Sequence, residues 1–95
     1  MRSYEMMFIL NPELPSEGID AAKSRVQEII AQTGGEFTEY DVWGKRRLAY
    51  EIKDYREGYY VLAYFNATAT TVNELDRVLK ITDDFLRHMI VRKDD

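Results

Sequence analysis

In residues 3–10 the side chains fall into two sets at every second position, one for each face of an extended chain. This period of two predicts a β-strand. One face of this strand carries Tyr4, Met6, Phe8 and Leu10. The other face carries Glu5, Met7 and Ile9. Residues 11–15 hold both prolines of the chain, and prolines this close together favour a turn. A strand followed by a turn therefore opens the chain.

A helical spacing of apolar residues follows the turn. The stripe comprises Ile19, Ala22, Val26, Ile29, Ile30 and Thr33. Separations of mostly three and four residues place these side chains on one side of a helix, which is typical of a helix that packs against a sheet. Ser16 is expected to be the N-cap of this helix. Gly34 and Gly35, which tolerate positive φ, are expected to end it.

Residues 36–53 are rich in β-forming side chains but too numerous for one straight strand. The β-formers are Phe37, Tyr40, Val42, Trp43, Leu48, Tyr50 and Ile52. At about 3.3 Å per residue the segment would exceed the diameter of a small domain, so a bend is expected, at Gly44. Residues 54–58 predict a turn, and residues 59–65 predict a third strand that pairs with the second as a hairpin.

The last third of the chain predicts a second helix and a final strand. Thr71 and Glu74 have the spacing of a capping box at the start of this helix. The apolar stripe that follows comprises Val72, Leu75, Val78 and Leu79. Residues 85–93 are expected to form the closing strand.

The order strand, helix, strand, strand, helix, strand predicts an α+β domain with split βαβ (βαββαβ) topology. In this topology a four-stranded antiparallel sheet has the strand order 4-1-3-2, and two helices cover one face. The first and last strands are then neighbours, so Arg2 is expected beside Arg92 and Lys93 in one basic corner. No linker or repeat interrupts the pattern, so residues 1–95 are expected to form a single domain.

The face of the sheet that no helix covers, the open face, is expected to be apolar. Its residues are Met7, Ile9, Tyr60, Leu62 and Tyr64. Exposed apolar surface of this kind commonly marks an interaction site, so these five residues are expected to contact a protein partner. The alternative is a half-buried sheet with amphipathic tyrosines. The last strand lacks clear alternation, and its faces are not assigned.

Composition narrows the functional class. The 95 residues suffice for one small domain, and the absence of cysteine excludes disulfides, thiolate zinc sites and cysteine nucleophiles. The apolar run at residues 6–10 is too short to span a membrane, so a cytoplasmic location is expected. The formal charge is −4, yet cations gather locally, which suits a protein that contacts a polyanion on one side. The alternative is scattered, solvated charge.

Catalytic and metal-binding chemistry finds little support in the sequence. His88 is the only histidine and lies among arginines, so a structural or phosphate-contacting role is expected. The serines lack the context of a nucleophile. The carboxylate pairs are interpreted as solvated charge, namely Asp83 with Asp84 and Asp94 with Asp95. No enzyme activity, cofactor, metal or small-molecule substrate is expected.

The strongest local signal is a run of three cations at the expected bend, Lys45, Arg46 and Arg47. Aromatic residues flank this run, with Trp43 before it and Tyr50 after it. Arginine binds phosphate oxygens through two-point contacts, and aromatic rings stack on unpaired bases. The segment therefore predicts a contact with RNA. The alternative is a solvated bend whose cations pair with Glu39, Asp41 or Glu51.

A free-standing single-stranded-RNA binding module of the RNA-recognition-motif type is a competing interpretation. Residues 7–11 resemble the first-strand motif of such modules, and residues 56–61 faintly resemble the third-strand motif. In that case Phe8 and Tyr60 would stack on bases from the open face. The alternation of the first strand places Phe8 under the helices instead. Solvent exposure of Phe8 therefore distinguishes the two interpretations.

Four blocks of sequence, taken in this order and spacing, resemble the bacterial small-subunit ribosomal protein six family. The blocks are residues 1–5, 44–52, 58–62 and 89–92. The most specific block is Gly-Lys-Arg-Arg-Leu-Ala-Tyr-Glu-Ile, at residues 44–52. The family commonly has proline where this chain has Glu51. The resemblance covers nearly the whole chain.

The resemblance implies a ferredoxin-like domain that binds the central domain of small-subunit ribosomal RNA together with the basic S-eighteen ribosomal protein. By matching position, it implies RNA contacts at Arg2, Arg46, Arg47 and Arg92. Further candidates for RNA contact are Lys45, Arg87 and Lys93. A basic partner would supply part of the phosphate neutralisation, which accounts for the acidic net charge. The partner contacts on the open face rest on its apolar character and not on a family motif.

Overall fold

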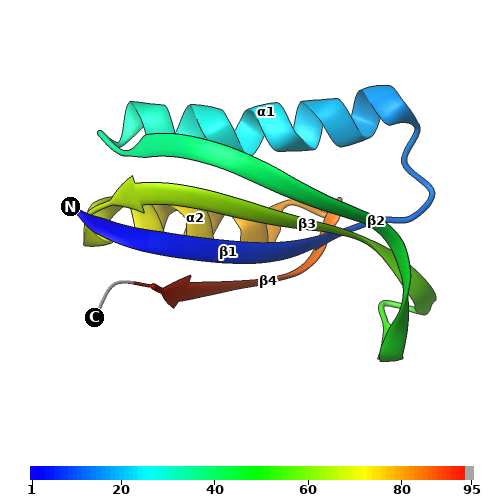
Figure 1. The fold of residues 1–95 in the computed structure, drawn as a ribbon. Coiled ribbons are helices and arrows are strands. Elements are labelled where there is room, and N and C mark those ends of the chain that lie inside the picture. The colour runs from blue at the N-terminus through cyan, green and yellow to red at the C-terminus, as the bar shows by residue number, and fades with distance from the viewer. Residues whose placement is uncertain (94–95) are drawn as a thin grey trace.

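Residues 1–93, which the computed structural model describes, form a four-stranded antiparallel sheet and two helices. The elements are β1 (Arg2–Leu10), α1 (Ser16–Gln32), β2 (Glu36–Ile52), β3 (Tyr55–Ala67), α2 (Ala69–Ile81) and β4 (Phe85–Arg92). The strands lie in the order β2-β3-β1-β4, and both helices pack on the same face of the sheet (Figure 1). This arrangement confirms the predicted split βαβ topology and its strand order.

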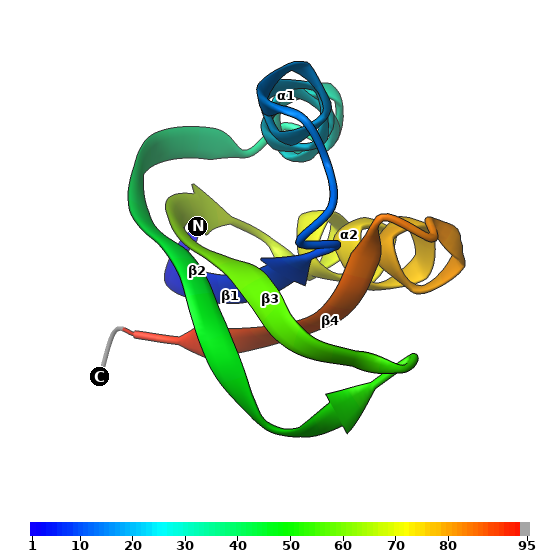
Figure 2. The same ribbon diagram turned by 90° about the vertical axis from the view of Figure 1, so that its right-hand side faces the viewer.

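The main core lies between the sheet and the two helices, which lie on the same side of the sheet in the end view of Figure 2. The strands contribute Met6, Phe8, Leu10, Val61, Ala63 and Phe65, which are almost completely buried. The helices contribute Val26, Ile29, Ile30, Leu75, Val78 and Leu79. Burial of each large apolar side chain stabilises the fold by roughly 1.5–3 kcal/mol. The alternating and helical patterns of the sequence therefore identify the core correctly.

Both predicted helix N-caps are wrong. Helix α1 begins at Ser16, so its N-cap is Pro15, and no side chain caps the helix. The φ of Pro15, −69°, lies in the range that its ring imposes, so this position costs the proline nothing. Helix α2 begins at Ala69 after the N-cap Thr68, which places Thr71 inside the helix. The sequence pattern therefore located the start of α1 one residue too late and the start of α2 three residues too late.

Thr71 joins the two helices instead of capping one of them. Its side chain is completely buried, and its hydroxyl oxygen lies 2.8 Å from that of Thr33, just after α1. The Thr33 hydroxyl also lies 2.7 Å from the carbonyl oxygen of Ile29. Glu74, the expected second member of the capping box, forms an ion pair at 2.8 Å with Arg77. A buried hydroxyl needs a hydrogen-bond partner, and each threonine supplies one for the other.

The predicted bend in the second strand is confirmed. Gly44 has a φ of +80°, and the pairing register between β2 and β3 shifts between Val42 and Gly44. Such a shift is a β-bulge, which bends a strand and increases its twist. The hairpin itself turns at Lys53 and Asp54, whose φ angles are 51° and 69°. This two-residue turn is tighter than the expected turn at residues 54–58, so β3 begins earlier than predicted.

Beyond the bend, residues 44–58 form an arm of the hairpin that curls under the open face of the sheet (Figures 1 and 2). Leu48 of this arm packs against Ile9 and Leu86, and all three side chains are buried. The close approach needs a glycine, because a Cβ added to Gly58 would lie 2.2 Å from the Cγ2 atom of Ile9. The arm therefore builds a second, smaller core on the side of the sheet opposite the helices.

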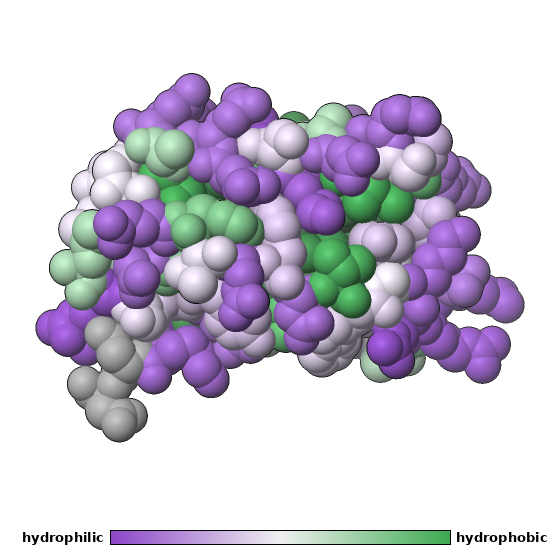
Figure 3. Space-filling view, turned by 45° about the horizontal axis from the view of Figure 1, so that its top comes forward, coloured by the Kyte–Doolittle hydropathy of each residue, from purple (hydrophilic) through white to green (hydrophobic). Residues whose placement is uncertain are grey.

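The exposed side of the molecule that includes α1 is mainly hydrophilic, unlike the core. Figure 3 shows mainly hydrophilic residues there, with hydrophobic residues confined to small separate areas. Within residues 1–93, no helix is long and apolar enough to cross a lipid bilayer.

We predict that Gly58→Ala lowers the free energy of unfolding by about 1–3 kcal/mol, because the added methyl group overlaps Ile9 and displaces the arm. Chemical denaturation followed by circular dichroism measures this loss. The same substitution in an Ile9→Leu background should cost less, since leucine has no methyl group on Cβ. Equal losses in both backgrounds would show that the contact between Gly58 and Ile9 does not limit packing.

Candidate RNA and protein interface

The open face carries a shallow apolar trough that runs along the strands. Two hollows of about 190 and 200 Å³ form it, and they meet at Met7 of β1 and Met89 of β4. The first hollow is also lined by Ile9, Tyr60, Arg87 and His88. The second hollow is also lined by Glu5, Trp43, Leu62 and Val91. The trough is therefore built from all four strands.

The five residues expected to be exposed on the open face are less accessible than the alternation suggested. Ile9 and Leu62 each expose only 7% of their surface, so the expectation of exposure is wrong for both. The arm covers Ile9, and Leu62 lies on a central strand with neighbours on both sides. The other three, Met7, Tyr60 and Tyr64, are half-buried. Of these five side chains, only these three offer surface to a partner.

The most exposed apolar side chains of this face were not among the predicted partner contacts. Met89 is 57% exposed, Val91 is 44% exposed and Trp43 is 43% exposed. Met89 and Val91 line the trough from β4, because Arg87, Met89 and Val91 alternate with inward-facing residues. That period of two was present in the sequence, but it starts only after an irregularity in the β1 to β4 pairing near Leu10.

Trp43 is held in a fixed position at the edge of the trough. Its ring stacks on Tyr60, with centroids 6.3 Å apart and an angle of 14° between the planes. Its Nε1 donates a hydrogen bond of 3.1 Å to Asp41. The guanidinium carbon of Arg46 lies 5.9 Å from the ring centroid, which is within reach of a cation–π interaction. These contacts couple the basic bend directly to the trough.

The three cations at the bend, Lys45, Arg46 and Arg47, are exposed. Within residues 1–93, none of the three forms an ion pair with the carboxylates that the alternative interpretation named, Glu39, Asp41 and Glu51. Glu51 instead pairs with Arg56, at 3.2 Å. The charges at the bend therefore remain available to an external anion. The Nε of Arg46 donates a hydrogen bond of 3.4 Å to the carbonyl oxygen of Trp43.

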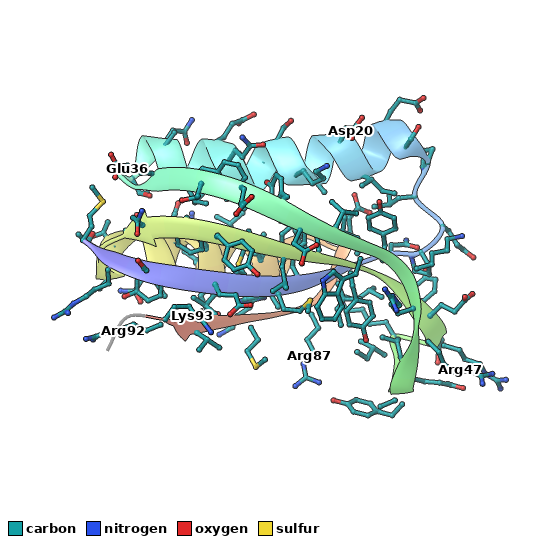
Figure 4. All side chains as sticks on the ribbon, in the orientation of Figure 1. Asp20, Glu36, Arg47, Arg87, Arg92 and Lys93 are labelled. Carbon is teal, nitrogen blue, oxygen red and sulfur yellow. The ribbon has the colours of Figure 1, made fainter. Side chains whose placement is uncertain are left out.

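A second basic region lies at the other end of the sheet, where the start of β1 meets the end of β4. Arg92 pairs with Tyr4 in the sheet register, and the amide of Lys93 donates a 2.8 Å hydrogen bond to Ser3. Figure 4 shows Arg92 and Lys93 at this end and Arg47 at the opposite end. The predicted basic corner with Arg2 is thus formed, although the side chain of Lys93 also pairs with Glu5 at 3.2 Å. The predicted pair Asp94 with Asp95 lies outside the described residues.

Arg87 and His88 of β4 do not belong to either basic region, and each contacts another element of the chain. Arg87 reaches toward the arm, where its guanidinium contacts the hydroxyl of Tyr50 and lies 6.0 Å from the ring centroid (Figure 4). His88 is mostly buried, and its Nε2 lies 2.7 Å from Oδ1 of Asp76 in α2. Hydrogen bonds from His88 and then from Lys80 lower the pKa of Asp76. His88 therefore joins β4 to a helix, which agrees with the structural one of the two roles expected for it.

The burial of Phe8 decides between the two RNA-binding interpretations. Phe8 is 0% exposed and packs in the main core, with Phe85 at a centroid distance of 5.5 Å. A buried ring cannot stack on a base, so the prediction of a recognition-motif platform that uses Phe8 and Tyr60 is wrong. The open face also carries carboxylates along β2, which a phosphate backbone would avoid.

We predict that Leu62→Asn lowers the free energy of unfolding by about 2–5 kcal/mol, because it removes buried apolar volume and buries an amide. Met89→Asn, on the same face but exposed, should cost less than about 1 kcal/mol. Thermal or urea denaturation of both variants measures the difference. Equal costs would show that the centre of the open face is not packed as described.

Comparison with known proteins identifies the family. The family model of ribosomal protein S6 matches residues 3–92. Small ribosomal subunit protein bS6 of Syntrophomonas wolfei is 55% identical over 96 aligned positions, which cover 100% of this chain and 99% of that protein. The bS6 protein of Carboxydothermus hydrogenoformans is 53% identical over 94 positions, 99% of this chain and 98% of the other.

A solved structure gives the same result for the fold. The crystal structure of 30S ribosomal protein S6 from Thermotoga maritima superposes with a TM-score of 0.90 at 33% identity. The superposition covers 97% of this chain and 87% of that chain. Fold, sequence and length thus agree over nearly all of the chain, as the blocks of sequence implied. The chain belongs to the ribosomal protein S6 family.

Proposed function

We propose that this protein binds the central domain of small-subunit ribosomal RNA together with the S-eighteen ribosomal protein. As a member of the ribosomal protein S6 family it is a structural protein of the small ribosomal subunit and not an enzyme. The cytoplasmic ribosome is accordingly its location. RNA contact and the identity of the partner go beyond the family assignment and rest on the arrangement of the surface.

The observation that carries the proposal is the separation of apolar and basic surface. The trough lies in the middle of the open face, whereas the cations gather at the two ends of a molecule that measures 36 × 27 × 22 Å. An apolar trough suits a protein partner, and exposed guanidinium groups suit phosphate. One protein therefore has room to hold a partner and an RNA at the same time.

The net charge favours RNA binding together with a basic protein partner. At −4, the chain as a whole repels RNA at long range, and only its local cations attract it. A basic partner seated in the trough would add positive charge next to those cations. Joint binding is therefore expected to be much stronger than binding of this chain alone.

The proposed RNA contacts fall in the two basic regions. At the bend they are Lys45, Arg46 and Arg47, and at the β1 and β4 end they are Arg2, Arg92 and Lys93. Arg87 lies between the two regions, where Tyr50 orients it. The proposed partner contacts are Met7, Tyr60 and Tyr64, with Trp43, Met89 and Val91 added from the structure.

We predict that Arg46→Ala with Arg47→Ala leaves the fold intact and weakens binding to a central-domain RNA fragment in the presence of the partner. Two lost phosphate contacts should lower the magnitude of the slope of log K against log salt by about one to two. A filter-binding titration at several salt concentrations measures the slope. Short single-stranded oligonucleotides without the partner should bind weakly to either protein.

The matched control removes two arginines from the helices, Arg25→Ala with Arg77→Ala. These side chains form exposed ion pairs with Glu28 and Glu74, which contribute little to stability. The control changes the net charge by the same amount. If both double variants bind RNA alike, the bend does not contact RNA.

For the partner, we predict that Met89→Ala weakens binding of the S-eighteen protein by about 1–2 kcal/mol, roughly 5- to 30-fold, because Met89 joins the two hollows. Isothermal titration calorimetry measures the affinity. Ile81→Ala is the control, since Ile81 is an apolar side chain, 72% exposed, at the end of α2. Equal affinities of the two variants would show that the partner does not bind in the trough.

A further inference from the structure

The two long edges of the trough differ in charge. On the β2 edge, Glu39 and Asp41 are exposed and pair in register with Tyr64 and Leu62 of β3. On the β4 edge, the exposed residues are Met89 and Val91, with Arg87 beyond them. The trough is thus bounded by carboxylates on one side and by apolar and basic groups on the other.

The carboxylates on the β2 edge are not neutralised within the described chain. In residues 1–93, no lysine or arginine forms an ion pair with Glu39 or Asp41. Asp41 accepts a hydrogen bond from Trp43, which holds the carboxylate beside the trough. Glu5, inside the trough, is different because Lys93 pairs with it at 3.2 Å. Two negative charges therefore stand free along one edge of an apolar surface.

We propose that the occupant of the trough is an amphipathic, basic segment of the S-eighteen partner, oriented by this difference between the edges. Its lysine or arginine side chains lie along Glu39 and Asp41, and its apolar side chains enter the hollows at Met7 and Met89. This inference rests on the proposed function, because it takes the partner from there and adds the orientation.

The reverse orientation is disfavoured by the charges on β4. It would bring the cations of the partner toward Arg87 and would leave Glu39 and Asp41 facing apolar side chains. Like charges brought together, and carboxylates covered by apolar groups, both weaken an interface. The same carboxylates disfavour an RNA strand in the trough, and they disfavour a second copy of this acidic chain that presents the same edge.

The test compares three variants of the full chain by calorimetric titration with purified S-eighteen protein at low and moderate salt. Glu39→Lys with Asp41→Lys reverses the edge, whereas Glu39→Gln with Asp41→Asn neutralises it and keeps an oxygen acceptor for Trp43. Asp20→Lys with Glu28→Lys is the control, because it changes the net charge by as much as the reversed edge does, but on α1, away from the trough (Figure 4). Circular dichroism checks that each variant is folded.

We expect at least tenfold weaker binding for the reversed edge, a smaller loss for the neutral edge and less than a twofold change for the control. The salt dependence of binding should also decrease in the reversed and neutral variants. If the reversed variant does not fold, the test compares the affinity of the neutral variant for S-eighteen protein with the affinity of the control.

Two negative outcomes are distinguishable. If the unaltered protein does not bind S-eighteen protein, the proposed function fails. If the unaltered protein binds but the edge variants match the control, only the orientation fails. If sedimentation shows that the unaltered protein alone forms a dimer that the edge variants lose, the trough is a contact between copies, and the proposal is overturned.

Discussion

The contact between Gly58 and Ile9 sets the shape of the surface on which the proposed function depends. Because Gly58 has no side chain, the arm can approach β1 closely enough for Leu48 to reach Ile9 and Leu86. The arm therefore covers one end of the open face and leaves the trough open beside it. It also fixes the cations of the bend relative to the trough, because Trp43 contacts both. A small core thus defines the geometry of a much larger surface.

The topology could be predicted from the sequence because local patterns determine it. The alternation of β1, the apolar stripes of the helices and the glycine at the bend each act over a few residues, and together they allow few arrangements. The helix N-caps could not be predicted in the same way. Thr71 has the right spacing for a capping box, but the completely buried position beside Thr33 makes its hydroxyl bond across to α1. That contact joins residues 38 apart in sequence.

The candidate site was predicted only in part, for a related reason. The cations of the bend and of the β1 and β4 end were evident from sequence, since exposed charge needs no tertiary context. Exposure of apolar residues on the open face depends on what else covers them. The arm buries Ile9, and the central position of β3 buries Leu62, whereas Met89 is exposed because β4 is an edge strand. No pattern within β1 or β3 contains this information.

The position of β1 in the sheet bears on how the protein folds during its own synthesis. This first strand pairs on one side with β3 and on the other with β4, which comes last among the elements of residues 1–93. One row of its backbone amides and carbonyls consequently waits without a sheet partner until residues 85–92 have left the ribosomal exit tunnel. Such long-range pairing slows folding and leaves an unpaired edge in the nascent chain. Completion of the sheet therefore waits for the synthesis of β4.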